Sequence, residues 1–210
     1  MSFGAFLIQA MLISLSGVMG PGPLSVVVVD EGARSPRAGL LIALGHGVVE
    51  FPLMALIAVG FAPVLERPLF GAIVGLAGGV VLLWMGVGLL RSLSRPIETE
   101  RRKASSPFVA GMVMSAANPY FLVWWATVGA TLVFRALEYG IWLFVVFAVA
   151  HWSLDVGWDF LLSSASHRGF RVLGPRFLKG VSLVAGVLLA FFGIRFVIDA
   201  APTLMDAAGL

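Results

Sequence analysis

Residues 69–90, LFGAIVGLAGGVVLLWMGVGLL, run for 22 positions without a charged side chain. A bilayer core about 30 Å thick needs about 20 apolar residues for one helical crossing. The whole chain shares this character, because 60% of its residues are hydrophobic, only 12% are charged and its mean hydropathy is +1.01. A soluble domain has about 25% charged residues. The sequence therefore predicts an all-α integral membrane protein and excludes a soluble globular domain.

Six apolar segments of this kind occur in the chain, separated by short polar connections. The division between the second and third segments rests on Pro63 and on Glu66-Arg67-Pro68, which favour a tight turn. One transmembrane domain over residues 1–210 is therefore expected. Its crossings are predicted at Phe3–Val29, Leu40–Phe61, Leu69–Leu90, Phe108–Phe134, Ile141–Ser163 and Leu178–Ile198.

The basic residues are distributed unevenly between these segments. Eleven lie in or beside the connections after the first, third and fifth segments, whereas three, Arg67, Arg135 and Arg195, lie on the other side. Cytoplasmic connections of membrane proteins are enriched in Lys and Arg. The bias predicts a multi-pass protein of the plasma membrane with both termini outside. The same placement argues against nucleic-acid binding, although the pI is about 10.0.

The two halves of the chain carry similar features in the same order. The first segment is interrupted by Gly20-Pro21-Gly22-Pro23, and the fourth is interrupted by Asn118-Pro119. The following segment of each half carries a histidine and a carboxylate four residues apart, namely His46 with Glu50 and His151 with Asp155. Each half has three crossings, an odd number, so the second half must be inverted relative to the first.

Inverted repeats with interrupted helices at corresponding places are typical of secondary transporters. The sequence therefore predicts six transmembrane helices arranged as two inverted three-helix repeats, with broken helices 1 and 4. The repeats are expected at about residues 1–90 and 108–199, and residues 91–107 form a cytoplasmic loop between them.

The two interruptions are candidate substrate-binding elements. Proline removes an N–H donor and clashes with the preceding turn, while glycine adopts conformations that other residues avoid. Each break leaves free carbonyls, which attract an ammonium group, and the N-terminal end of a half-helix, which attracts a carboxylate. The residues expected at this site are Pro21, Gly22, Pro23, Asn118 and Pro119.

Trp124 and Trp125 follow the second interruption. Their rings could present an aromatic face to a bound cation, which makes them further substrate-binding candidates. Tryptophan is also enriched at membrane–water interfaces. The sequence leaves both interpretations open.

Glu50, Asp155 and Asp159 are acids inside apolar segments. A charge there costs from about 2.5 to well over 10 kcal/mol, so such residues usually face a cavity and carry function. His46 shares a helix face with Glu50, and His151 shares one with both aspartates. These five side chains are candidate proton-coupling groups. A structural buried ion pair and a divalent-metal site built from the same five ligands are the alternatives.

These motifs resemble the lysine exporter (LysE/RhtB) family of amino-acid efflux proteins over essentially the whole chain. Gly20-Pro21-Gly22-Pro23, the basic loop before Gly39 and Gly45-His46-Gly47 resemble the opening of that family. Asn118-Pro119 and Asp155-Val156-Gly157-Trp158 resemble its second half. The resemblance implies a proton-driven exporter of amino acids or related small metabolites. Tyr120 stands where the family commonly has a basic residue, which indicates a bulkier or more apolar substrate.

A small-molecule substrate and the lipid bilayer are the expected partners. The stripe Gly71-x-x-x-Gly75-x-x-x-Gly79 could pack helices within one chain or form a homodimer contact. No cofactor and no enzymatic activity are expected, because the chain has no cysteine, no phosphate-binding loop and no nucleophile motif.

Overall fold

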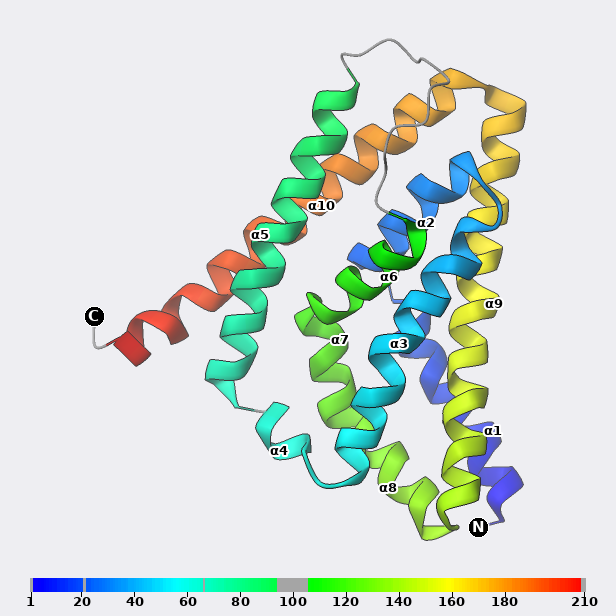
Figure 1. Ribbon diagram of the computed structural model, residues 1–210, viewed down its shortest axis with the longest axis vertical. Coiled ribbons are helices and arrows are strands. Elements are labelled where there is room, and N and C mark those ends of the chain that lie inside the picture. The colour runs from blue at the N-terminus through cyan, green and yellow to red at the C-terminus, as the bar shows by residue number, and fades with distance from the viewer. Residues whose placement is uncertain (1, 21, 66, 94–105, 209–210) are drawn as a thin grey trace.

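The computed structural model describes residues 2–20, 22–65, 67–93 and 106–208, and every regular element within these ranges is helical (Figure 1). The predicted all-α class is thus confirmed for the described part of the chain. The elements are α1 (Phe3–Val18), α2 (Pro23–Arg34), α3 (Ala38–Ala58), α4 (Ala62–Leu65), α5 (Pro68–Ser92), α6 (Pro107–Ala116), α7 (Pro119–Trp124), a π-helical turn η1 (Trp125–Gly129), α8 (Ala130–Glu138), α9 (Ile141–Leu173) and α10 (Pro175–Ala208).

Five spans are long and apolar enough to cross a membrane: α3, α5, the run from α7 to α8, α9 and α10. A sixth is obtained when α1 and α2 count as one crossing, and these two helices meet at 75°. The predicted separation of the second and third segments is also observed, because α3 ends at Ala58 and α5 begins at Pro68.

The fourth segment is not the single helix that hydropathy suggests. α6 ends at Ala116 and α7 begins at Pro119, where the proline ring cannot continue the preceding helix. Asn118 caps α7, because its side-chain oxygen accepts a hydrogen bond from the Tyr120 N–H at 3.1 Å. The π-helical turn η1 follows directly, and such turns are frequent at functional sites.

Several predicted segment ends were wrong. α2 continues to Arg34 beyond Val29, and α9 continues to Leu173 beyond Ser163. The apolar run ends in both cases, but the helix continues through the polar residues that follow. α9 ends only at Gly174, whose φ of 67° favours glycine.

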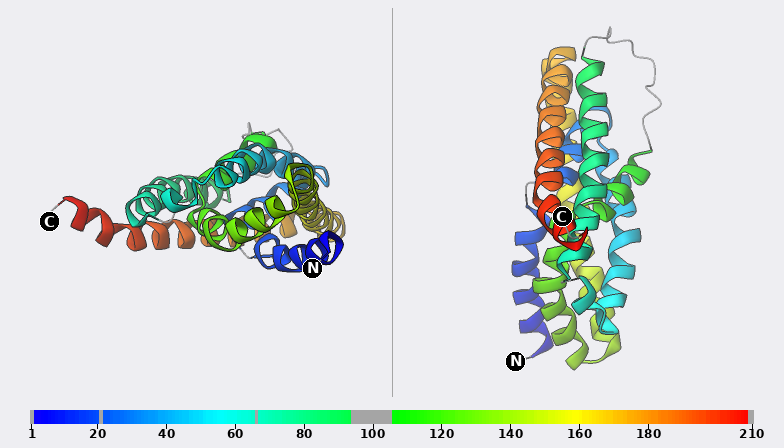
Figure 2. Two further views of the ribbon diagram at one scale, coloured as in Figure 1. Left: turned by 90° about the horizontal axis from the view of Figure 1, so that it is seen from below. Right: turned by 90° about the vertical axis from the view of Figure 1, so that its left-hand side faces the viewer.

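α5 and α10 form a long pair at one side of the molecule (Figures 1 and 2). A Cβ atom at Gly79 would lie 2.8 Å from the Gly193 carbonyl oxygen of α10, and one at Gly193 would lie 2.8 Å from the Gly79 carbonyl oxygen. Gly75 also faces α10. These two members of the glycine stripe therefore pack helices within one chain, and the homodimer stays a prediction.

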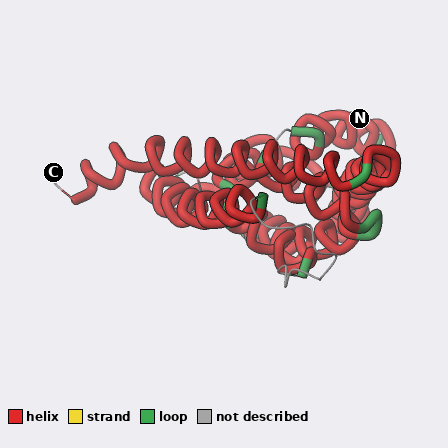
Figure 3. Tube along the Cα trace, turned by 90° about the horizontal axis from the view of Figure 1, so that it is seen from above, coloured by secondary structure: helices red, strands yellow, loops and turns green. Residues whose placement is uncertain are grey.

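The remaining helices form the other side of the molecule, where α2 packs along α9 and α6 packs along α3. A Cβ at Gly45 of α3 would overlap the Phe108 carbonyl, and one at Gly111 of α6 would overlap the Ile42 carbonyl. Small residues thus bring these backbones together, as is common between membrane helices. Seen from above, α10 leans out of this group toward the C-terminus (Figure 3).

The two ends of the bundle differ in charge. The N-terminal end of α1 and the C-terminal ends of α3 and α8 lie at one end, and the C-terminal ends of α2, α5 and α9 lie at the other (Figure 1). The second end carries most of the described cations, and these are Arg34, Arg37, Arg91, Arg168, Arg171, Arg176 and Lys179. Arg95, Arg101, Arg102 and Lys103, which also support the predicted orientation, lie outside the described residues.

Candidate functional site

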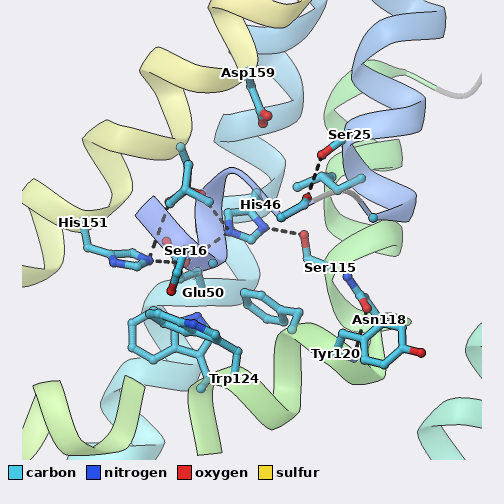
Figure 4. Close-up of a pocket in the computed structure, with 18 residues that line it drawn as sticks. Ser16, Ser25, His46, Glu50, Ser115, Asn118, Tyr120, Trp124, His151 and Asp159 are labelled. Carbon is cyan, nitrogen blue, oxygen red and sulfur yellow. Dashed lines mark hydrogen bonds and ion pairs between the residues drawn. The ribbon is translucent and has the colours of Figure 1, made fainter. Parts of the chain in front are cut away.

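A cavity of about 250 Å³ lies where the two helix breaks meet α3 and α9. Gly20 and Gly22 from the first break and Asn118 from the second line the same cavity. Pro23 and Pro119 start α2 and α7 but do not line it, and Pro21 lies outside the described residues. The other predicted site residues all line this cavity, namely His46, Glu50, Trp124, Trp125, His151, Asp155 and Asp159 (Figure 4).

His46 is held from two sides in the wall of the cavity. Its Nδ1 lies 2.6 Å from Ser115 Oγ, and Ser115 Oγ donates its own hydrogen to the Gly111 carbonyl at 2.7 Å. The serine oxygen must therefore accept, so Nδ1 of His46 carries a hydrogen. The other ring nitrogen, Nε2, faces Glu50 Oε1 at 3.2 Å. A proton is needed between these two atoms to make that contact favourable.

His151 repeats this arrangement from the opposite side. Its Nδ1 lies 2.7 Å from Ser14 Oγ of α1, and its Nε2 lies 3.3 Å from the same Glu50 Oε1. One carboxylate oxygen is therefore shared by both imidazoles. The two histidines, their two serine partners and Glu50 are all buried. The sequence analysis did not predict Ser14 and Ser115 as site residues. The one signal that could have indicated them is their position in the helix just before each break.

Asp155 completes the cluster at a slightly greater distance. Its Oδ1 lies 3.9 Å from His46 Nε2, and its Oδ2 lies 3.8 Å from His151 Nε2. Asp159 lies one helical turn further along α9 and points into the same space (Figure 4). Because a buried charge at membrane depth is costly without a partner, this group must be balanced by protons or by a cationic ligand.

Four buried polar atoms of the cavity wall have no hydrogen-bond partner among the described residues. Three are carboxylate oxygens, Glu50 Oε2, Asp155 Oδ2 and Asp159 Oδ2, and the fourth is the indole donor Trp124 Nε1. Buried polar groups are normally hydrogen-bonded, and each exception calls for an explanation. The site therefore offers acceptors for a cation and one donor for an anion in a single cavity.

The aromatic wall is built by the helices after the second break. The ring of Trp125 lies 4.9 Å from that of His151, and Trp124 lies 5.5 Å from the same imidazole. Phe121 packs edge-on to His46 at 5.0 Å. Trp125 is only 1% exposed. These two tryptophans thus surround the polar cluster rather than anchor the chain at the membrane surface.

A fourth buried acid, Asp30, lies outside this cavity. Its side chain accepts hydrogen bonds from Arg34 Nη2 at 3.2 Å and Ser182 Oγ at 2.7 Å, which ties α2 to α10. The sequence analysis counted only three acids inside the apolar segments. It missed Asp30 because the predicted first crossing stopped at Val29, one residue too early.

Fewer residues converge on a possible metal site than the sequence predicted. His46, Glu50 and Asp155 each place one ligand atom within 4.8 Å of the others. A mixed nitrogen and oxygen set of this kind suits first-row divalent metals. His151 and Asp159 do not belong to this close group, so three of the five predicted ligands converge.

The sequence matches a family described as "LysE type translocator" over residues 15–200. The chain belongs to the LysE family. The match confirms the resemblance noted in the sequence. It spans both helix breaks and every described residue that lines the cavity, whereas Ser14, which contacts His151, lies one residue before it.

Several relatives of the chain are named as amino-acid efflux proteins. The chain is 24% identical to the "Putative amino acid efflux protein YcgF" of Bacillus subtilis (strain 168) over 181 residues, which cover 83% of this chain and 87% of that protein. It is 26% identical to the "Threonine efflux protein" of Escherichia coli (strain K12) over 210 residues, covering 92% and 98%. The protein of the same name from Salmonella typhimurium is 25% identical, covering 90% and 95%. No solved structure matches the chain.

The serine supports can be tested through stability. Replacing Ser115 by alanine leaves the buried Nδ1–H of His46 without its acceptor, so Ser115→Ala should lower the free energy of unfolding by about 1–3 kcal/mol. Ser153→Ala is the matched control, because Ser153 is exposed and its hydroxyl donates to the Ala150 carbonyl of its own helix. Thermal unfolding of the purified protein in detergent measures both. Equal melting temperatures for the two variants would contradict the arrangement around His46.

Proposed function

We propose that this chain is a secondary exporter of amino acids and that the cavity at the two helix breaks binds the substrate. One observation carries the proposal: four atoms without a hydrogen bond among the described residues line one buried cavity, namely the acceptors Glu50 Oε2, Asp155 Oδ2 and Asp159 Oδ2 and the donor Trp124 Nε1. An α-amino acid carries an ammonium group and a carboxylate on one carbon. It can therefore satisfy both kinds of unpaired group at once.

The substrate ammonium is assigned to the carboxylates of α3 and α9, where it would be stabilised by charge-assisted hydrogen bonds. The substrate carboxylate is assigned to Trp124 Nε1 and to the N-terminal end of α2, whose Leu24 and Ser25 line the cavity. A volume of about 250 Å³ suits a small solute. The names of the Escherichia coli and Salmonella relatives make threonine the first substrate to test.

Removing the indole N–H of Trp124 should weaken the binding of the substrate carboxylate and leave the binding of the ammonium group unchanged. Trp124→Phe is expected to weaken threonine binding about tenfold or more, because a hydrogen bond to a charged group contributes about 1.5–3 kcal/mol. Binding of 1-aminopropan-2-ol, which is threonine without its carboxylate, should stay unchanged. Calorimetric titration of the purified protein measures both ligands. Trp84→Phe is the control, because Trp84 is 77% exposed and lies away from the cavity.

A divalent-metal carrier is the second candidate, and the close group of His46, Glu50 and Asp155 supports it. The same titration separates the two candidates. Binding of threonine by the unmodified protein, lowered in Trp124→Phe, supports the amino-acid exporter. Binding of Mn²⁺ or Zn²⁺ without any binding of threonine would overturn it in favour of the metal carrier.

We further propose that proton movement drives export and that the carboxylates of the site exchange an ammonium group for protons. The contacts of Glu50 Oε1 with Nε2 of His46 and Nε2 of His151 are favourable only when a proton lies between the atoms. The Asp155 carboxylate lies within 4 Å of the same two nitrogens. A substrate ammonium and a proton would compete for the same oxygens. Such competition couples the two fluxes, because each species is released when the other binds.

Proteoliposomes test this coupling. An imposed pH gradient should drive threonine uphill in the unmodified protein, whereas Glu50→Gln and Asp155→Asn should lose the gradient-driven accumulation. Asp199→Asn is the control, since that carboxylate is about half exposed and pairs with Arg195 on the surface of α10. The coupling proposal is abandoned if both site variants respond to the gradient as the unmodified protein does.

We also propose that the two halves are inverted repeats and that the basic end of the bundle faces the cytoplasm of a cell whose plasma membrane holds the protein. The serine of each broken helix supports the histidine of the opposite half, Ser14 with His151 and Ser115 with His46. The helices that precede the breaks are exchanged in the same way, because α1 packs on α9 and α6 packs on α3. A twofold relation between the halves accounts for both exchanges.

The orientation is testable because the chain has no natural cysteine. Val59 at the end of α3 is 81% exposed, and Val172 near the end of α9 is 82% exposed at the opposite, basic end. A membrane-impermeant maleimide added to intact cells should label Val59→Cys and leave Val172→Cys unlabelled. The reverse labelling would place the basic end outside.

A further inference from the structure

A second cavity of about 600 Å³ lies between α2 and α10. Ser25 is the one polar side chain among the described residues that line it. Val26 and Val29 of α2 form one wall, and Val181, Val184 and Leu188 of α10 form the other. The cavity therefore suits an apolar group and has nothing that would hold a charged one.

This apolar cavity adjoins the polar site. Gly22 and Ser25 line both cavities. The hydroxyl of Ser25 donates to the Gly20 carbonyl at 3.3 Å, so it is turned toward the helix break. The junction is thus formed by one glycine and one small side chain whose polar atom is already bonded.

Gly22 forms part of this junction without any structural need for glycine. Its φ of −150° and ψ of −179° describe extended backbone, which any residue adopts before a proline. A Cβ atom built there would meet no atom closer than the Gly20 carbonyl oxygen at 4.0 Å. Neither the backbone nor the packing of the described residues therefore excludes a side chain. A side chain at this position would instead occupy the free space beside the shared wall.

The register of α2 and α10 sets the direction of the apolar cavity. The hydrogen bond between Asp30 and Ser182 fixes the level at which these antiparallel helices meet. Gly22 and Ser25, which precede Asp30, consequently lie near Leu188, and the cavity extends from there toward Val184 and Val181. One helical turn on α10 covers about 5.4 Å. A side chain of four to six carbons that enters at Gly22 would therefore reach the level of Val184.

We infer that the apolar cavity binds the side chain of an amphipathic amino acid whose ammonium and carboxylate groups occupy the polar site. The inference rests on the proposed function and names a substrate class within it, namely α-amino acids with extended apolar side chains. The shared wall of Gly22 and Ser25 favours this occupant over a lipid acyl chain, because it places the apolar cavity directly beside the groups that would hold the ammonium and the carboxylate.

A series of α-amino acids with unbranched side chains of two to six carbons tests the inference. The purified full-length protein is titrated with each member, from 2-aminobutyrate to 2-aminooctanoate. Burying one methylene contributes about 0.8 kcal/mol, so the affinity should rise about fourfold for each added carbon. Val184→Phe and Leu188→Phe narrow the cavity and should abolish this rise for the longer members while the shorter ones bind as before.

Val187→Phe is the matched control, since it carries the same substitution on the same helix. Val187 is 52% exposed and lines neither cavity, so this variant should keep the full rise. An affinity that stays flat or falls with chain length, while 2-aminobutyrate still binds, would overturn the inference and leave the proposed exporter intact. If threonine binds but no member of the series does, the inference fails and the proposed function stands; if neither threonine nor any member binds to the folded protein, both fail.

Discussion

Glu50 Oε1 accepts contacts from two imidazoles at membrane depth, and much of the structure can be understood as support for that arrangement. A carboxylate buried in an apolar medium is tolerable only when it is paired and its surroundings are hydrogen-bonded. His46 and His151 supply the pairing from α3 and α9. Ser115 and Ser14 then hold the far nitrogen of each ring. Four helices must therefore converge on one oxygen atom, and the rest of the fold has to permit this convergence.

Small residues and broken helices are what permit it. Gly45 and Gly111 allow α3 and α6 to approach until a side chain at either position would overlap the other backbone. The breaks before Pro23 and Pro119 end α1 and α6 near the cluster, so the serines stand next to the histidines that they support. Irregular backbone at membrane depth is tolerated where it is enclosed by protein or lines a cavity, and Gly20, Gly22 and Asn118 fulfil the second condition.

The same constraint explains why the site suits a zwitterion. The histidines satisfy one oxygen of Glu50, whereas Asp159 Oδ2 and the indole N–H of Trp124 keep no protein partner among the described residues. Acceptors and a donor thus face one small space beside an aromatic wall. On the other side of Gly22 the surroundings change to valine and leucine. The polar and the apolar cavity thus share the wall formed by Gly22 and Ser25, and in the proposed function this helix break divides the two ends of the substrate.

Local features of the sequence were enough to predict the membrane class, the apolar crossings, the two breaks and the histidine–acid pairs. Each of these depends on residues that are adjacent or one helical turn apart, as His46 and Glu50 are. The family could be recognised from the same short motifs, and the match over residues 15–200 confirms it. Segment ends were less accurate, because α2 and α9 continue as helices after their apolar runs stop.

Tertiary structure alone decided which groups meet. His46 and Ser115 are 69 residues apart, His151 and Ser14 are 137 apart, and Asp30 and Ser182 are 152 apart. No periodicity links such positions, so only the packing of α1, α3, α6, α9 and α10 could bring them into contact. The apolar cavity beside Gly22 is likewise a property of two helices from opposite halves of the chain. The sequence thus determined the kinds of residue available at the site, and the packing determined their partners, because a side chain's partner across a helix interface depends on where distant backbones can approach.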